Sequence, residues 1–186
     1  MSYSKRHTTP IKTLPLAILV TLALSACSPN SEIAEQDIGK PTQSLTEWLD
    51  AQYEEELLFS PIDLTFLGRK ELNSEIDPFT YAAFAEQLAW KKSSVEQMQA
   101  LYKREELTQD ERLSFDLWDY QLKRMQESEQ FFYDGLVFDQ MNGIQSFVPT
   151  FLINFHRVET ADDMRAYIER VKAVAPRIQE AIDNAT

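Results

Sequence analysis

Residues 108–131 read TQDERLSFDLWDYQLKRMQESEQF, and this stretch decides the fold class. Thr108 and Glu111 have the spacing of a capping box, in which the two side chains satisfy free backbone amides at the start of a helix. Large apolar residues follow every three or four positions, at Phe115, Trp118, Leu122 and Met125. That spacing places them on one face of a helix. The sequence therefore predicts an amphipathic helix from Thr108 to about Phe131.

The segments before residue 70 carry two shorter helical patterns. Behind Ser44, which suits an N-cap, apolar residues recur every four positions, at Leu45, Leu49, Tyr53 and Leu57. This spacing predicts a helix over residues 45–58. Ser60 followed by Pro61 is typical of a helix start. We expect a short turn of helix from there through Phe66, and Gly68 should end it.

A longer pattern runs from about Phe79 to Arg104 and predicts one long helix. Its apolar face consists of Phe84, Leu88, Val95, Met98 and Tyr102. Lys91 and Lys92 interrupt this face.

The last helical region begins at Thr160 and Asp163. Its apolar face consists of Met164, Ile168, Val171, Ala175, Ile178 and Ile182. Pro176 should kink or divide this helix. No segment has a convincing run of two-residue alternation, so strands are not expected. Because the connections are short, the sequence predicts an all-α array of antiparallel neighbours.

Residues 131–155 differ from the rest of the chain, because they hold two of the four glycines and many large apolar residues. Between Gly135 and Phe155 only Asp139 is charged. Exposing such a stretch costs about 1.5 to 3 kcal/mol per large apolar side chain, so we expect it to be buried. It is either a core element of the helical domain or a surface that packs against a region outside this chain.

The N-terminus has the layout of a secretory signal. Lys5, Arg6 and Lys12 precede an uncharged stretch over residues 13–26, which is too short to span a bilayer. Its end, Leu24-Ser25-Ala26-Cys27, resembles the lipobox of bacterial lipoproteins. The resemblance implies cleavage between Ala26 and Cys27 and lipidation of Cys27. The alternative is an ordinary cleaved signal followed by a chance thiol.

The chain therefore divides into three predicted parts. Residues 1–26 are a lipoprotein signal peptide, and residues 27–43 are a lipidated N-terminus and flexible tether, because they are polar and contain proline and glycine. Residues 44–186 form the helical region. Two or more acyl chains anchor a protein stably. Ser28 after the cysteine resembles outer-membrane sorting, so we expect a bacterial cell-envelope protein that is held by lipid and faces the periplasm.

The charge balance argues against nucleic acid as a partner. The whole chain has a formal net charge of −12. Three of the 18 basic residues and none of the 30 acidic ones precede Cys27, so the rest carries −15. A polyanion of this kind is repelled by phosphate backbones. The single cysteine excludes an intrachain disulfide framework.

No self-contained active site can be assigned from the residues. After signal cleavage His156 is the only histidine, so the usual ligand sets of catalytic zinc cannot be made, and His156 is interpreted as a packed or capping residue. No Gly-x-Ser-x-Gly elbow accompanies a triad, and phosphate-binding and EF-hand patterns are absent. Acidic pairs such as Asp116 with Asp119, or Glu54 with Glu56, are interpreted as solvated helix faces. We therefore predict no catalytic and no metal residues.

Three stretches together resemble a known family. They are LTEWLDAQYEEELLFSPIDLTFLG (45–68), LTQDERLSFDLWDYQL (107–122) and FDQMNGIQSFVPTFLINFHRVETADDMRAYIERVKAV (138–174). In this order they are similar to the N-terminal part of the bacterial domain-of-unknown-function family 885, whose members are often lipoproteins. The likeness covers most of residues 44–186.

The resemblance implies a large helical, zinc-metallopeptidase-like protein with a His-Glu motif and a Pro-Gly-His motif in its C-terminal half. This sequence contains no His-Glu pair, so no catalytic residue is carried over and zinc is implied only for a full-length relative. The chain is then either a fragment of a longer enzyme or a shortened relative that no longer catalyses.

Three functional hypotheses follow. The first is an N-terminal scaffold of a lipid-anchored metallopeptidase-like protein, inactive by itself and completed by a missing C-terminal part. The second is a freestanding, non-catalytic helical lipoprotein that binds a partner protein through residues 131–155. The third is an acidic cation-binding module.

Overall fold

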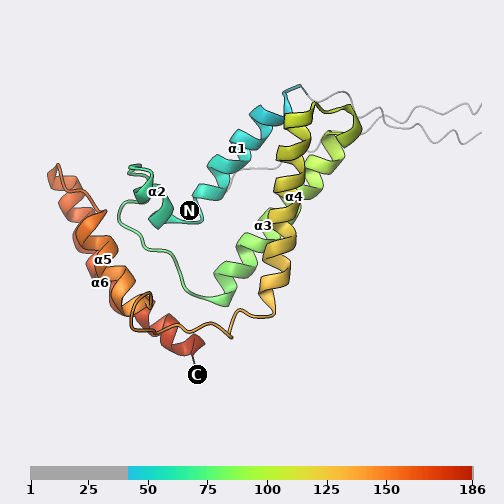
Figure 1. The fold of residues 1–186 in the computed structure, drawn as a ribbon. Helices are drawn as coiled ribbons and strands as arrows, with labels where there is room; N and C mark the ends of the chain where they lie inside the picture. The colour runs from blue at the N-terminus through green and yellow to red at the C-terminus, as the bar shows by residue number, and fades with distance from the viewer. Residues whose placement is uncertain (1–41, 186) are drawn as a thin grey trace, which may run out of the picture. The chain divides into compact units, whose positions relative to one another are not determined.

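The computed structural model describes residues 42–185. Within these residues the regular secondary structure is helical and no strand is present, and Figure 1 shows α3 beside α4 and α5 beside α6. The elements are α1 (Leu45–Leu57), α2 (Pro61–Phe66), α3 (Tyr81–Leu101), a 3₁₀ turn η1 (Arg104–Glu106), α4 (Gln109–Glu129), α5 (Ile144–Asn154) and α6 (Ala161–Asn184). The predicted all-α class is confirmed.

The predicted signal peptide, Cys27 and the tether up to residue 41 lie outside the described residues. Among residues 42–185, no helix combines the length and the apolar character that a bilayer span requires.

Hydroxyl side chains begin the helices where the sequence predicts. Ser44, Ser60, Thr108 and Thr160 cap α1, α2, α4 and α6 respectively. At α4 the Thr108 amide donates to Glu111 Oε2 at 2.9 Å, and the Glu111 amide donates to Thr108 Oγ1 at 3.4 Å. These bonds satisfy amides that the first turn of a helix leaves free.

Gly68 ends α2, as the sequence predicts. It has a positive φ of 76°, a conformation that glycine adopts without steric cost. Its amide donates to the Thr65 carbonyl at 2.9 Å, and the Arg69 amide donates to the Leu64 carbonyl at 2.8 Å. These two bonds form a Schellman motif, which redirects the chain after α2.

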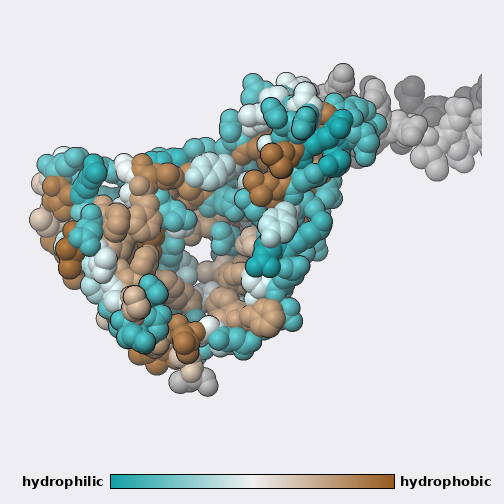
Figure 2. All heavy atoms as spheres, in the orientation of Figure 1, coloured by the Kyte–Doolittle hydropathy of each residue, from teal (hydrophilic) through white to brown (hydrophobic). Residues whose placement is uncertain are grey.

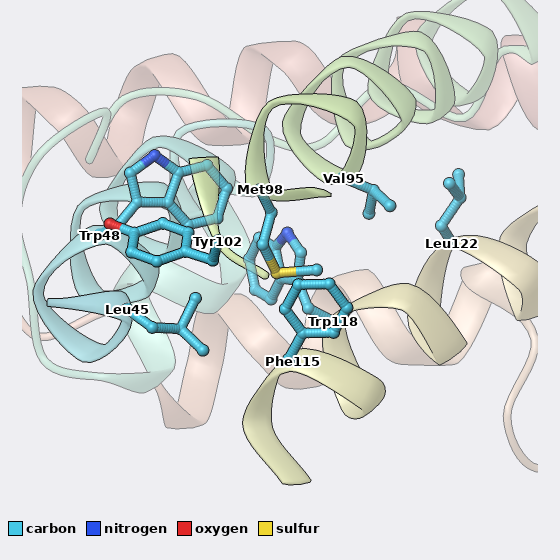
Figure 3. Packing of buried hydrophobic residues seen from close by; sticks show 8 residues of the cluster. All are labelled: Leu45, Trp48, Val95, Met98, Tyr102, Phe115, Trp118 and Leu122. Atoms are coloured by element: carbon cyan, nitrogen blue, oxygen red, sulfur yellow. The ribbon is translucent and has the colours of Figure 1, made fainter. Parts of the chain in front are cut away.

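The first hydrophobic core lies between α1, α3 and α4 (Figure 3). It contains Leu45, Trp48, Val95, Met98, Tyr102, Phe115, Trp118 and Leu122. Three of the four residues predicted for the apolar face of α4 belong to this core, so the prediction is confirmed for them, while Met125 is only half-buried. The Trp118 indole donates to Ser94 Oγ at 3.0 Å, which satisfies its polar atom inside the core.

Leu45 and Leu57 are buried in α1 as predicted, and the predicted face is wrong at Tyr53. Trp48 is buried, whereas Tyr53, predicted to face the core, is 47% exposed. Trp48 packs edge-on against Tyr102 with ring centroids 6.2 Å apart, and the Tyr102 hydroxyl donates to the Gln43 carbonyl at 3.1 Å. A four-residue period fits either face of this helix, and the larger indole is the side chain that gains more from burial.

The second hydrophobic core lies between α2, α5 and α6. It contains Ile62, Ile76, Ile144, Val148, Phe151, Leu152 and Ala181. Val148 is 0% exposed and Phe151 is 1% exposed. The interpretation of residues 131–155 as a core element is therefore confirmed for α5.

The first half of the same segment is not buried, so the expectation of burial was wrong there. Leu136 is 84% exposed, Met141 is 77% exposed and Tyr133 is 61% exposed. Phe132 packs against Tyr81 and Phe84, and local hydrogen bonds hold the turn that follows. The Asp139 carboxylate accepts from the amides of Met141 at 2.6 Å and Asn142 at 2.5 Å, which makes a tight turn.

The buried side of α6 is not the apolar side that the sequence predicts. Met164, Ile168 and Val171 are 46%, 45% and 48% exposed, although the sequence predicts them on the contact face. Hydrophobic (brown) atoms are visible on the surface over α5 and α6 in Figure 2. The buried face carries Arg170, which is 0% exposed, and α6 continues through Pro176 without being divided.

Candidate functional site

A cleft of about 900 Å³ lies between the first turns of α3 and the C-terminal half of α6, and we call it the α3–α6 cleft. The space-filling view shows a hollow near the middle of this face of the molecule (Figure 2). Its lining includes Asp77, Phe79, Phe84, Phe132, Phe147 and Arg177. A volume of this size is typical of ligand sites.

Side chains of α6 fix one wall of the cleft by holding the backbone of Phe79. Glu180 Oε2 accepts from the Phe79 amide at 3.0 Å, and Asn184 Nδ2 donates to the Phe79 carbonyl. Glu180 also pairs with Arg177 Nη1. Within residues 42–185, Arg177 Nε is a buried side-chain nitrogen without a hydrogen-bond partner.

Asp77 fixes the wall near the start of α2. Its carboxylate accepts from Ser60 Oγ at 2.6 Å and from the Ile62 amide at 2.9 Å. Burial raises the pKa of Asp77, and the two hydrogen bonds oppose that rise. Sequence reasoning missed this residue, because its partners lie 17 and 15 positions earlier in the chain.

A cluster of polar groups surrounds the side chain of Arg170, next to the second hydrophobic core. Its guanidinium donates from Nε to the Glu75 carbonyl at 2.8 Å, from Nη2 to Thr65 Oγ1 at 2.8 Å and from Nη1 to His156 Nδ1 at 2.9 Å. Nη2 also reaches the Pro61 carbonyl at 3.2 Å. All these acceptors are neutral groups, and burial lowers the pKa of Arg170 to about 10.

His156 is a packed residue, as the sequence predicts. Its Nδ1 accepts from Arg170 and its Nε2 donates to the Asp163 carbonyl at 3.2 Å, an arrangement that requires the neutral ring. The ring also stands edge-on to Tyr167, with centroids 5.2 Å apart. The part of the chain that the structure describes has no group of three His, Cys, Asp or Glu residues placed to hold a metal ion.

The stability of the protein should depend on the protonation of His156. Burial, and secondarily the nearby charge of Arg170, lowers its pKa below the ordinary 6.5, while the Asp163 carbonyl opposes the shift. The unfolded chain therefore binds more protons just below pH 6.5, and stability falls as the pH drops through that window. Lys70, Asp163 and Arg170 are the charged groups around the ring.

Urea unfolding at about pH 7.5 and about pH 5.5 measures this effect. The wild-type midpoint should fall over that interval, and the His156→Gln variant should fall less. An equal fall in both proteins would contradict the assignment.

Lys91 is a second buried cationic side chain, and it does not interrupt the face of α3 as the sequence suggested. It is 0% exposed, and its ammonium lies 3.2 Å from the centroid of the Trp118 ring. Its Nζ contacts both carboxylate oxygens of Glu56 at 3.1 Å and Gln121 Oε1 at 2.7 Å. Burial lowers the pKa of Lys91, and Glu56 opposes that shift. Since Nζ is enclosed by these partners, Lys91 is an anchor between helices.

The acidic pairs singled out in the sequence are not paired with each other. Asp116 binds Arg104 at 2.6 Å, Asp119 binds Lys123 at 2.6 Å and Glu54 binds Arg69 at 2.6 Å. Such ion pairs belong to solvated surfaces. Glu56 is the exception, because it binds the buried Lys91.

Within residues 42–185 these features define a helical region with two cores, two buried cationic anchors and the α3–α6 cleft. A family-wide sequence profile described as Bacterial protein of unknown function (DUF885) matches residues 61–186. The chain belongs to this bacterial family, and the resemblance seen in the sequence is confirmed. Comparison with curated proteins and with solved structures gave no match.

Proposed function

We propose that residues 44–186 are the N-terminal helical scaffold of a larger, lipid-anchored cell-envelope protein of a zinc-peptidase-like family. In this proposal the helical region is not catalytic by itself. Any zinc would be bound by residues outside this chain, because the one histidine of the helical region already bonds Arg170 and the Asp163 carbonyl.

The outer face of α6 is the observation that carries this proposal. Met164, Ile168 and Val171 lie within two turns of one another and are each nearly half exposed. Contiguous apolar surface of this kind marks a site where another element packs. Further helices of the larger protein would cover this face. This explains why α6 carries apolar side chains on a side that packs against no described helix.

The lipid anchor is the second part of the proposal, and it rests on the lipobox. Cys27 would carry the acyl chains after cleavage behind Ala26. The residues between Cys27 and Ser44 would then hold the helical region near the membrane, facing the periplasm, with the outer membrane as the expected site.

The intact mass of the native protein tests both parts. The protein is extracted from membranes with detergent and detected with an antibody against residues 108–131. We expect a lipidated species much larger than the 21.6 kDa of this chain. A Cys27→Ser variant is the matched control, and it should lose the lipid mass and leave the membrane fraction while keeping the rest of its length.

The same measurement distinguishes the alternative, a freestanding non-catalytic lipoprotein that binds a partner protein. The exposed side chains of Leu136 and Met141, in the segment 131–155, favour such a binding surface. A lipidated species near the mass of residues 27–186 would contradict the scaffold proposal and support this alternative. A full-length species without lipid would contradict the anchor alone.

A further inference from the structure

The walls of the α3–α6 cleft are aromatic on several sides. Phe79 precedes α3, Phe84 lies in its first turn, Phe132 follows α4 and Phe147 lies in α5. The rings of Phe84 and Phe132 pack with centroids 5.5 Å apart, so they form one continuous surface. Aromatic faces carry negative charge density and attract cations as well as apolar groups.

The charged residues of the cleft are mostly acidic. Asp63, Glu75 and Glu86 line it, and within residues 42–185 none of these three carboxylates forms an ion pair. Arg177 also lines the cleft, but Glu180 compensates its charge. A cleft with unpaired charges of one sign concentrates ligands of the opposite sign.

One donor in the wall has no acceptor. Arg177 Nε is buried and unpaired, while Nη1 of the same guanidinium bonds Glu180. Buried donors in folded proteins nearly always have a partner. Once the Arg177 side chain turns toward the cleft, a neutral ligand oxygen would supply an acceptor without bringing a negative charge close to Glu180.

We propose that the α3–α6 cleft binds a positively charged amphiphile. Such a ligand has an amine or quaternary ammonium group, an aromatic or aliphatic body and a neutral oxygen acceptor. Its body packs against the rings of Phe84 and Phe132, its cation lies near Glu86, and its oxygen accepts from Arg177 Nε after the guanidinium turns toward the cleft. An anionic ligand fits less well, because the three unpaired carboxylates repel it.

Binding of thioflavin T, a cationic aromatic dye, tests the proposal. The native protein is reconstituted in nanodiscs of zwitterionic phospholipid, and the signal of empty nanodiscs is subtracted. We expect saturable binding at one site that weakens as salt is raised, because salt screens the carboxylates. The anionic dye anilinonaphthalene sulfonate should not displace thioflavin T.

A matched pair of variants on α3 locates the site. Glu86 and Glu96 are both exposed residues of α3, and of the two only Glu86 lines the cleft. Glu86→Gln should weaken thioflavin T binding by about 2- to 5-fold, the range typical of one exposed charge pair, and Glu96→Gln should leave it unchanged. Unchanged binding in Glu86→Gln, displacement by the anionic dye or the absence of saturable binding would each overturn the proposal.

Discussion

Replacing Arg170 by leucine is expected to lower the free energy of unfolding by about 3 to 5 kcal/mol. The side chain is 0% exposed, and its removal leaves Thr65, His156 and the Glu75 carbonyl without their donor. Each buried acceptor left unpaired costs about 1 to 3 kcal/mol, and water cannot easily reach this cluster. Urea unfolding followed by far-ultraviolet circular dichroism measures the change.

Arg165→Leu is the matched control on the same helix. Arg165 is 69% exposed and pairs with Asp162 at the surface, so its loss should change stability by no more than about 0.5 kcal/mol. Thr65→Val offers a second test should Arg170→Leu fail to fold, because it removes one acceptor and should cost about 1 to 2 kcal/mol. Equal effects of the two arginine substitutions would refute the anchoring role of Arg170.

The contacts of Arg170 could not be predicted from the sequence. Arg170 contacts the Glu75 carbonyl 95 positions earlier and the Pro61 carbonyl 109 positions earlier, so no local pattern connects these groups. Arginine and lysine side chains are mostly exposed in folded proteins, so the sequence alone gives no reason to expect Arg170 to be buried. α4, in contrast, was predictable because its cap and its apolar spacing are both local.

α6 illustrates a different limit. One series on this helix, Met164, Ile168 and Val171, is apolar, and the series one position earlier, Asp163, Tyr167 and Arg170, has the same spacing. Both series suit a contact face, and hydrophobicity favoured the first. The structure turns the second inward, with Asp163 and Arg170 buried and Tyr167 half-buried, because the hydrogen bonds of Arg170 decide which side of α6 faces α5 and the loop before α3.

The candidate cleft could not be predicted as a unit. Its lining comes from the start of α2, the loop before α3, α3 itself, the segment after α4, α5 and α6. The sequence marks Phe132 and Phe147 only as members of an apolar stretch, and it gives no reason to place them near Glu86 or Arg177. Such a site becomes visible only after the helices are packed.

Removing Glu56 should destabilise the protein more than removing its partner Lys91. Glu56→Ala leaves an ammonium that is 0% exposed without its counter-ion, at an expected cost of about 2 to 4 kcal/mol. Lys91→Met keeps an unbranched apolar chain in the core, and the Glu56 side chain, already 24% exposed, regains water. The expected change for Lys91→Met is therefore about 1 kcal/mol or less, measured as before by urea unfolding.

The pH dependence of Glu56→Ala supplies an independent check. Burial already lowers the pKa of Lys91 below its ordinary 10.5, and loss of Glu56 lowers it further. The unfolded chain then binds more protons than the folded one over a wider window below pH 10.5, so stability in this window rises with pH. Glu56→Ala should recover part of its lost stability between about pH 7.5 and about pH 9.5, whereas Lys91→Met should not.

The neighbouring Glu55→Ala, which removes an exposed acceptor of the Trp90 indole, should show neither the large loss nor the recovery. If Lys91→Met proves as damaging as Glu56→Ala, the ammonium itself stabilises the core, and the attraction of Lys91 to Glu56 and Trp118 outweighs the cost of burying its charge.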